Sequence, residues 1–247
     1  MIQGLYTSVA GMIPRINQER SITSNLANQT TYGYKKTDVF LRQLITAQYA
    51  LDRASGIERT QVPESVFTNF TQGSFDRTDM PLDLALNGTG FFRVQDANGA
   101  VHYTRNGRFS LDPNGTLVNS RGMVLLNDRN LPIVLTDRNA QIMGDGTLLE
   151  NNVYRATIGV ADFNPAEIQG LIDIGGGIFM RPAAMAEAPR NPDTQVLQGY
   201  LEDSNVEPVL AMVDMIEVFR MFELGQQSVQ IQDQTLQRVV NELGVVR

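Results

Sequence analysis

Four aspartates are the residues of this sequence whose spacing comes nearest to known chemistry. Asp76, Asp79 and Asp83 stand in the segment SFDRTDMPLD, and Asp112 follows further along the chain. Carboxylates bind Ca²⁺, but this segment lacks the alternating oxygen ligands and central glycine of an EF-hand loop. Two carboxylates about 5 to 9 Å apart in a cleft would instead hydrolyse a glycan. A module that binds or hydrolyses cell-wall glycan is therefore one hypothesis, although the chain has no tryptophan for a sugar platform.

The other reactive side chains are scarce. The chain has no cysteine, which excludes disulfides, thiolate metal sites and thiol nucleophiles, and its single histidine, His102, has no serine or acidic partner suggested by spacing. The glycine runs NGTG and IGGGIF lack the strand and helix context of a dinucleotide site. We therefore expect no catalytic residue, no metal and no cofactor, and we interpret the aspartates as turn and strand-edge residues.

The charge and hydropathy pattern excludes two further classes. Twenty-seven acidic and twenty basic residues give a net charge of −7, without a basic run that could follow a phosphate backbone. We expect no nucleic-acid partner. No window approaches about 18 consecutive apolar residues, so no membrane insertion is expected. Polar residues interrupt the apolar ones at the N-terminus, which argues against a cleaved signal peptide.

Helical periodicity occurs at both ends of the sequence. Apolar residues recur at three- and four-residue steps between Ile2 and Leu26, with a kink or break expected at Pro14. The same periodicity returns after Ser204 and Asn205, two candidate helix caps, and continues for up to about 40 residues, or about 60 Å. Such a long apolar stripe needs a partner helix, and the N-terminal helix is the available one.

The middle of the chain has a different pattern of apolar residues and turn signals. Short apolar runs alternate with turn signals such as the Asp-Pro-Asn-Gly at 112–115, which predicts antiparallel strands. We therefore expect an α+β fold, in which a discontinuous, coiled-coil-like α-helical domain from both termini carries an inserted antiparallel β-rich domain. The predicted divisions are 1–35 for the first helix and its motif, 36–74 for an arm or linker, 75–200 for the β-rich domain and 201–247 for the last helix.

The segment SNLANQTTYGYKK, residues 24–36, is the strongest motif. From the residues alone it is a helix end followed by a glycine turn. Its pattern closely resembles the N-terminal signature of the axial proteins of the bacterial flagellum, the rod and hook family. The matching residues are Asn25, Leu26, Ala27, Asn28, Thr31, Gly33, Tyr34 and Lys35. Two more blocks resemble the family in the same order. Residues 77–95 followed by 103–122 resemble its central β region, and residues 199–223 resemble the start of its C-terminal helix.

This resemblance implies a non-enzymatic structural subunit of the flagellar basal-body rod. Such a subunit polymerises with copies of itself and with adjacent rod proteins into the shaft that crosses the periplasm and transmits torque. It is exported without cleavage through the flagellar type III apparatus. The short arm and the strings PLDLAL and SNVEPV are most similar to proximal rod members. A distal rod or hook-type subunit is the alternative within the family.

Two sets of residues are candidates for contacts with partners. The expected assembly core consists of Leu5, Val9, Ile16, Val213, Ile216 and Phe219. Phe40 and Leu44 are similar to an element that the export gate reads in axial substrates, and the alternative is that they cover a small core of the arm. The glutamine-rich stretch 226–237 is either a solvated helix face or a contact strip between subunits.

Overall fold

The computed structural model describes residues 2–40, 65–137 and 140–243. They form two units, each described by itself. The terminal unit takes its residues from 1–27, 37–69 and 207–247, and the β unit takes 28–36 and 70–206. The chain therefore crosses between the units four times, after residues 27, 36, 69 and 206.

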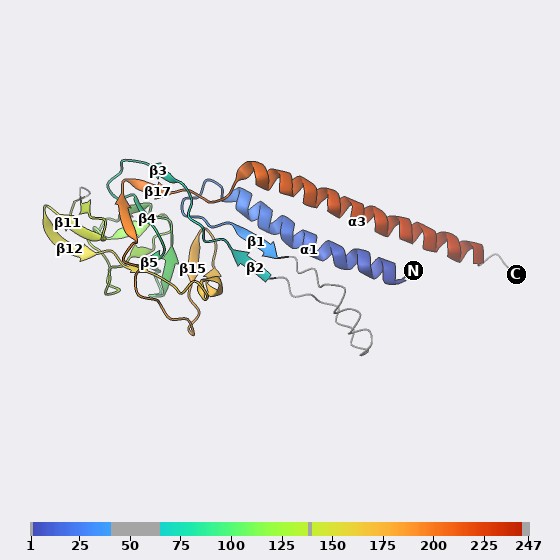
Figure 1. The fold of residues 1–247 in the computed structure, drawn as a ribbon, viewed down its shortest axis with the longest axis horizontal. Coiled ribbons are helices and arrows are strands. Elements are labelled where there is room, and N and C mark those ends of the chain that lie inside the picture. The colour runs from blue at the N-terminus through green and yellow to red at the C-terminus, as the bar shows by residue number, and fades with distance from the viewer. Residues whose placement is uncertain (1, 41–64, 138–139, 244–247) are drawn as a thin grey trace. The chain divides into compact units, whose positions relative to one another are not determined.

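The described residues of the terminal unit form two long helices and one strand pair. Helix α1 spans Ile2–Ala27 and helix α3 spans Pro208–Leu243, and the two lie side by side (Figure 1). They approach closely at Gly225, where an added Cβ would lie 3.0 Å from Met12 Cγ. Strands β1 (Thr37–Phe40) and β2 (Ser65–Thr68) pair antiparallel.

The path of α1 at Pro14 and the start of α3 differ from what the sequence predicts. The structure shows no break at Pro14, and α1 continues through it. A proline inside a helix costs about 3 kcal/mol, so we infer that the packing of α1 in the terminal unit outweighs this cost. Helix α3 begins at Pro208, where a missing backbone donor is tolerated, and its first turn closes from Ala211 N to Glu207 O at 3.0 Å. Asn205 therefore lies before the cap position.

The β unit consists of short antiparallel strands. One sheet has the order β14-β15-β6-β5-β9-β8-β7, with β13 paired to β5, and β10-β11-β12, β16-β4 and β17-β3 form smaller sheets. The strands are β3 (Phe75–Arg77), β4 (Leu84–Asn87), β5 (Phe91–Gln95), β6 (Val101–Thr104), β7 (Phe109–Leu111), β8 (Leu117–Asn119), β9 (Val124–Leu125), β10 (Gln141–Ile142), β11 (Thr147–Glu150), β12 (Val153–Thr157), β13 (Val160–Ala161), β14 (Ile172–Asp173), β15 (Ile178–Met180), β16 (Gln195–Gln198) and β17 (Tyr200–Glu202). A 3₁₀ turn covers Ile168–Gly170.

Strand β5 separates two hydrophobic clusters. Its side chains alternate between the faces of the sheet, so Phe92 and Val94 enter the larger cluster while Phe91 enters the smaller one. In the smaller cluster the rings of Phe91 and Phe179 lie 5.7 Å apart, edge to face. Because both faces of β5 are buried, this strand is the centre of the β unit.

The expected fold class is wrong. The described residues are mostly β-sheet with only two α-helices, which gives a β-rich core followed by a C-terminal helix, and not an α+β fold with a coiled-coil-like helical domain of its own. The physical reason lies in residues 37–40 and 65–68, which pair as strands in the same unit as the helices. Within the described part of the chain, neither helix has an apolar stretch long enough to cross a bilayer.

A polar network ties the loop after β15 to the large sheet. Tyr103 on β6 donates its hydroxyl proton to Glu187 Oε1 at 2.5 Å, and Arg93 on β5 contacts Glu187 Oε2 at 2.5 Å. Arg181 Nε donates to the Tyr103 hydroxyl at 3.2 Å. Burial and then the bond to Glu187 raise the pKa of Tyr103 from 10.0 to about 12.

This pKa predicts an alkaline loss of stability. Between pH 10 and about 12 the folded chain keeps the Tyr103 proton and the unfolded chain has lost it. The contribution of this proton to the free energy of unfolding is therefore complete below pH 10 and is lost as the pH rises to about 12. Urea unfolding of the wild type and Tyr103→Phe at several pH values between 9 and 12 tests this. We expect a shallower decline for the variant, and parallel declines would contradict the assignment.

Candidate assembly surface and the motif cluster

The motif at residues 25–35 begins at the end of α1. The Asn25 side chain bonds both backbone groups of Thr37, donating to its carbonyl at 2.8 Å and accepting from its N–H at 2.9 Å. The Ser21 hydroxyl also donates to the Thr37 carbonyl. The Asn25 amide thus satisfies both backbone groups of the first residue of β1. Leu26 is half-buried and Ala27 is exposed.

The next part of the motif is a tight turn in the β unit. Asn28 O accepts a bond from Thr31 N at 3.0 Å, and Tyr34, a buried residue, donates from its N–H to Thr31 O at 3.2 Å. Gly33 has a φ of 68°, and an added Cβ would lie 2.3 Å from Asn106 N. Glycine is therefore required for two reasons, its positive φ and the close backbone contact.

Lys35, the last motif residue, is a fully buried cation. Its Nζ lies 2.5 Å from Glu202 Oε1 on β17, and it donates to Thr71 O at 2.7 Å. Neither Lys35 nor Glu202 has solvent-exposed side-chain surface. Burial lowers the pKa of the Lys35 ammonium, and the neighbouring Glu202 carboxylate opposes that shift. The ammonium group of the motif lysine therefore has its partners, Glu202 and Thr71, within the same chain.

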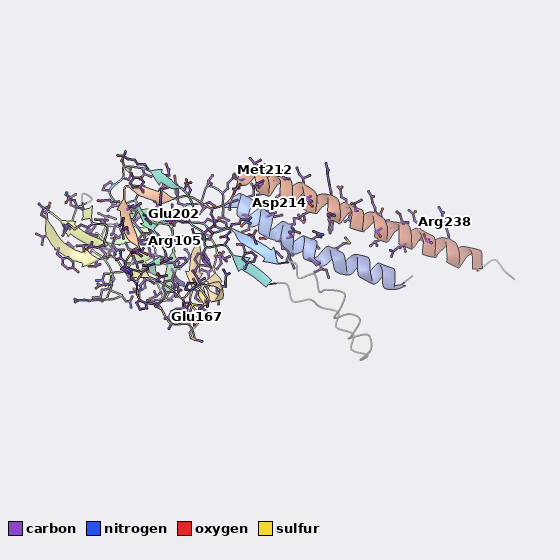
Figure 2. All side chains as sticks on the ribbon, in the orientation of Figure 1. Arg105, Glu167, Glu202, Met212, Asp214 and Arg238 are labelled. Atoms are coloured by element: carbon purple, nitrogen blue, oxygen red, sulfur yellow. The ribbon has the colours of Figure 1, made fainter. Side chains whose placement is uncertain are left out.

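A second buried cation shares the same carboxylate. Arg105 NH1 lies 3.2 Å from Glu202 Oε2, and Arg105 also donates to the carbonyls of Leu86 and Gly88. Its guanidinium lies 5.3 Å from the centroid of the Phe91 ring. Figure 2 labels Arg105 and Glu202 in the β unit. We name Lys35, Arg105 and Glu202 the motif cluster: two positive charges are held by one carboxylate, three carbonyls and an aromatic face.

Asn205 adds a second link beside the motif cluster. Its Oδ1 accepts a bond from Lys36 N at 2.7 Å, and its Nδ2 donates to Thr71 O at 3.1 Å. The backbone of Gly33 also donates to Glu202 O at 2.6 Å. The sequence indicated Asn205 as a candidate cap within a block that resembles the family, and it indicated no role for Glu202 or Arg105. These three residues lie far from the motif in the sequence, and no spacing pattern could have paired them.

The residues of the expected assembly core differ in their exposure to solvent. Val213, Ile216 and Phe219 lie on α3 and are exposed, at 55%, 54% and 44% of their surface. Ile16 on α1 is half-buried. Leu5 and Val9 lie in the backbone of α1, but their side chains fall outside the described residues.

Helix α3 is apolar on two sides. Ala211 and Val218 are buried, and their seven-residue spacing continues to Gly225, which approaches α1. The opposite side exposes apolar residues at three-, four-, seven- and eight-residue steps. This outer row consists of Val209, Val213, Ile216, Leu224 and Ile231. An exposed apolar row of this length is typical of a surface that binds another protein.

The candidate export residues lie at the edge of the described chain. Phe40 is the last residue of β1, and its side chain falls outside the described residues. Leu44 falls outside them entirely.

The candidate carboxylates have separate partners. Asp76 accepts a bond from the Tyr32 hydroxyl at 3.1 Å, and Asp79 pairs with Arg77 at the surface. Asp83 is buried and forms a bridge with Arg108 in the backbone. Asp112 accepts bonds from the backbone of its own turn. Among the described residues, no group of three or more acidic or histidine side chains could hold a metal ion.

His102 is buried, and a partner that spacing did not suggest lies nearby. Its Nε2 is 3.5 Å from Asp96 Oδ2, and Asp96 also accepts backbone bonds from residues 98 and 100. The bond from Ala100 N, more than the others, lowers the pKa of the Asp96 carboxyl. The backbone bonds to Asp96 therefore close the turn between β5 and β6.

The motif cluster predicts unequal costs for two substitutions. Glu202→Gln leaves two buried cations without a carboxylate, which we expect to cost about 3 to 5 kcal/mol. Lys35→Met should cost less, because Glu202 keeps Arg105 and the bond from Gly73 N. Urea unfolding of both variants measures the difference. Asp79→Asn, in an exposed pair, is the matched control and should change nothing. Equal losses for Glu202→Gln and Lys35→Met would contradict the shared carboxylate.

Known proteins match this chain over most of its length. Residues 85–149 match the family described as flagellar hook protein FlgE/F/G D1 domain, and residues 197–243 match the C-terminal region of flagellar basal-body rod FlgEFG proteins. The flagellar basal-body rod protein FlgF of Salmonella typhimurium is 33% identical over 91% of both chains, and FlgF of Caulobacter vibrioides is 32% identical over 90% of both. FlgG of Buchnera aphidicola from Acyrthosiphon pisum is 30% identical over 97% of this chain and 99% of its own. The expected resemblance is confirmed, and this chain belongs to the family of flagellar basal-body rod proteins.

Proposed function

We propose that this chain polymerises with other axial proteins into the part of the flagellar shaft that crosses the periplasm, where it transmits torque by packing and without catalysis. Membership of the rod family makes it a structural subunit of the flagellar basal body. The curated relatives are named as rod proteins, which supports a role without enzymatic activity.

The observation that carries the assembly mechanism is the outer row on α3. Its side chains are apolar and exposed on the side of the helix away from Val218 and Gly225, which leaves them free to contact neighbours. A contact between this row and a different surface of the next subunit is heterologous, and heterologous contacts generate open helical filaments. The outer row is therefore the proposed assembly surface, with Phe219 beside it and Ile16 on α1 as further members of the assembly core.

We further propose which segment of the rod contains this chain. The short arm and the strings PLDLAL and SNVEPV favour the proximal rod. Relatives named FlgF and FlgG have similar identities to this chain, so either segment is compatible with family membership.

We also propose export through the flagellar type III apparatus without a cleaved signal peptide, with Phe40 and Leu44 read by the export gate. The double substitution Phe40→Ala with Leu44→Ala tests this in a strain whose rod cannot assemble. Secretion should fall while the melting temperature of the purified variant is unchanged. Unchanged secretion would exclude the role.

Ile216→Asp should abolish rod assembly while the subunit stays folded. Ile216 is 54% exposed, so the charge remains hydrated in the free subunit, but a neighbour that buries it would pay several kcal/mol at every contact. Motility and the number of rods in purified basal bodies measure the effect.

Val218→Asp is the matched variant on the same helix. Val218 is only 3% exposed, so an aspartate there should destabilise the free subunit itself and lower its melting temperature. The two variants thus separate assembly from folding. Normal rods and motility with Ile216→Asp would show that the outer row faces solvent in the assembled shaft.

A further inference from the structure

We propose that two exposed apolar patches of the β unit bind each other between copies of this chain. The patch on the sheet β10-β11-β12 of one copy docks on the patch on the hairpin β14–β15 of the next. This contact is separate from the outer row on α3, and both patches lie within the β unit. Its place in a rod rests on the proposed function.

The first patch is the outer face of the sheet β10-β11-β12. The inner face of this sheet is buried, since Ile142, Leu148 and Ala156 lie opposite one another across the three strands and enter the larger hydrophobic cluster. The alternate residues of the strands therefore face outward. They are all uncharged, and we name them the tyrosine patch: Gln141, Met143, Thr147, Leu149, Tyr154 and Thr157.

The tyrosine patch has the composition of a protein interface. Tyr154 and Met143 are its most exposed members, at 56% and 51% of their surface. The Tyr154 hydroxyl and Thr157 Oγ1 form a hydrogen bond of 3.2 Å along this face. Tyrosine and methionine are enriched at the centre of interfaces, and charged residues are depleted there. We therefore expect this face to be covered by another protein surface.

The second patch lies on the hairpin β14–β15. Ile172 and Met180 are directly opposite each other in this hairpin, and Ile174 follows on the same side of the strand. These three side chains are 47%, 38% and 41% exposed, and we name them the isoleucine patch. The opposite face of the hairpin carries Phe179, which is buried in the smaller hydrophobic cluster.

The two patches lie on different edges of the β unit. Within the described part of the chain, β12 pairs only with β11 and β14 pairs only with β15. Figure 1 shows β12 and β15 at opposite ends of the β unit. One copy therefore cannot bring its own two patches together, but two copies can. A contact between two different patches is heterologous, so it continues from copy to copy and does not close a dimer.

The charges at the two edges favour a second copy as the partner. Arg155 is the only charged residue of β12, and Asp173 is the only charged residue of β14. The side chain of Arg155 is 48% exposed, although its Nε lies 2.7 Å from Glu150 Oε2, and Asp173 is also exposed. Docking of the two patches therefore brings a basic edge to an acidic edge. A patch docked on its own kind would instead place like charges together.

The patches are small, which decides how the contact must be measured. A stable interface has about 20 to 30 residues on each side, and these patches have far fewer. We therefore expect the contact to be transient between free chains and to persist between copies that other contacts hold together. A disulfide traps a transient contact as it forms. The chain has no cysteine, so introduced cysteines are its only thiols.

Cross-linking of the purified full-length chain tests the contact. Tyr154→Cys and Ile172→Cys are made as separate chains and mixed at high concentration with a mild oxidant. We expect dimers from the mixture and none above background from either chain alone, while a chain with both substitutions should give a ladder of multimers. The control is Leu131→Cys mixed with Ile172→Cys, because Leu131 is 57% exposed and lies outside both patches.

A second pair of cysteines covers a different register of the same contact. Leu149→Cys and Met180→Cys replace one residue of each patch, and their mixture should also give dimers. Disulfides form only where the two Cα atoms come within about 7 Å. Yields from both pairs no higher than the Leu131→Cys control would overturn the proposal. So would dimers from Tyr154→Cys alone, because they would show that the tyrosine patch binds its own kind.

Reversal of one edge charge tests the orientation. Asp173→Lys, added to the Ile172→Cys chain, places a lysine opposite Arg155 and should lower the yield with Tyr154→Cys about two- to fivefold. Asp193→Lys, at an exposed aspartate elsewhere in the β unit, is the matched control and should leave the yield unchanged. Equal yields from the two variants would contradict the pairing of the basic and acidic edges.

Purified basal bodies show whether the contact exists in the rod. The chain with both Tyr154→Cys and Ile172→Cys should give the same ladder there after oxidation. A cross-link to a different protein, or no cross-link in basal bodies that contain the chain, would overturn the contact between copies. Absence of the chain from basal bodies would overturn the proposed function instead, and the mixtures of purified chains would still decide whether the patches bind each other.

Discussion

The β unit depends on the burial of one carboxylate, that of Glu202. Its two oxygens are shared between Lys35 and Arg105, and its backbone oxygen accepts the N–H of Gly33. A buried carboxylate without these partners would be strongly destabilising, and so would either cation without the carboxylate. Lys35, Glu202 on strand β17 and Arg105 directly after β6 are therefore held together by one buried carboxylate.

The terminal unit is subject to a different constraint. Helix α3 has more apolar surface than one partner helix buries, since Val218 is covered while Val213 and Ile216 are exposed. In a monomer the exposed row contributes no hydrophobic stabilisation, because it stays in contact with water. A polymer does, because each neighbour that covers the row removes apolar surface from water. The proposed assembly would therefore cover apolar surface that the helices of the terminal unit leave exposed.

The sequence predicted the family and several local features, but not the fold class. The turn at 112–115 is confirmed, with Gly115 at a φ of 79°, because turn chemistry is local. The strand pair of residues 37–40 and 65–68 was missed, because its pairing is non-local and these short segments carry no helical or alternating period. The partners of Lys35 were missed for the same reason. Its motif identified an important residue, but a carboxylate far along the chain completes the site.

A density map of purified basal bodies, at a resolution that shows side chains, tests the central claim most directly. The account predicts that this chain lies in the rod, with Val213 and Ile216 covered by a neighbouring subunit. It also predicts that Lys35 and Arg105 both contact Glu202 in every copy. A rod without this chain would contradict the account, and so would a chain in the rod whose outer row on α3 faces solvent.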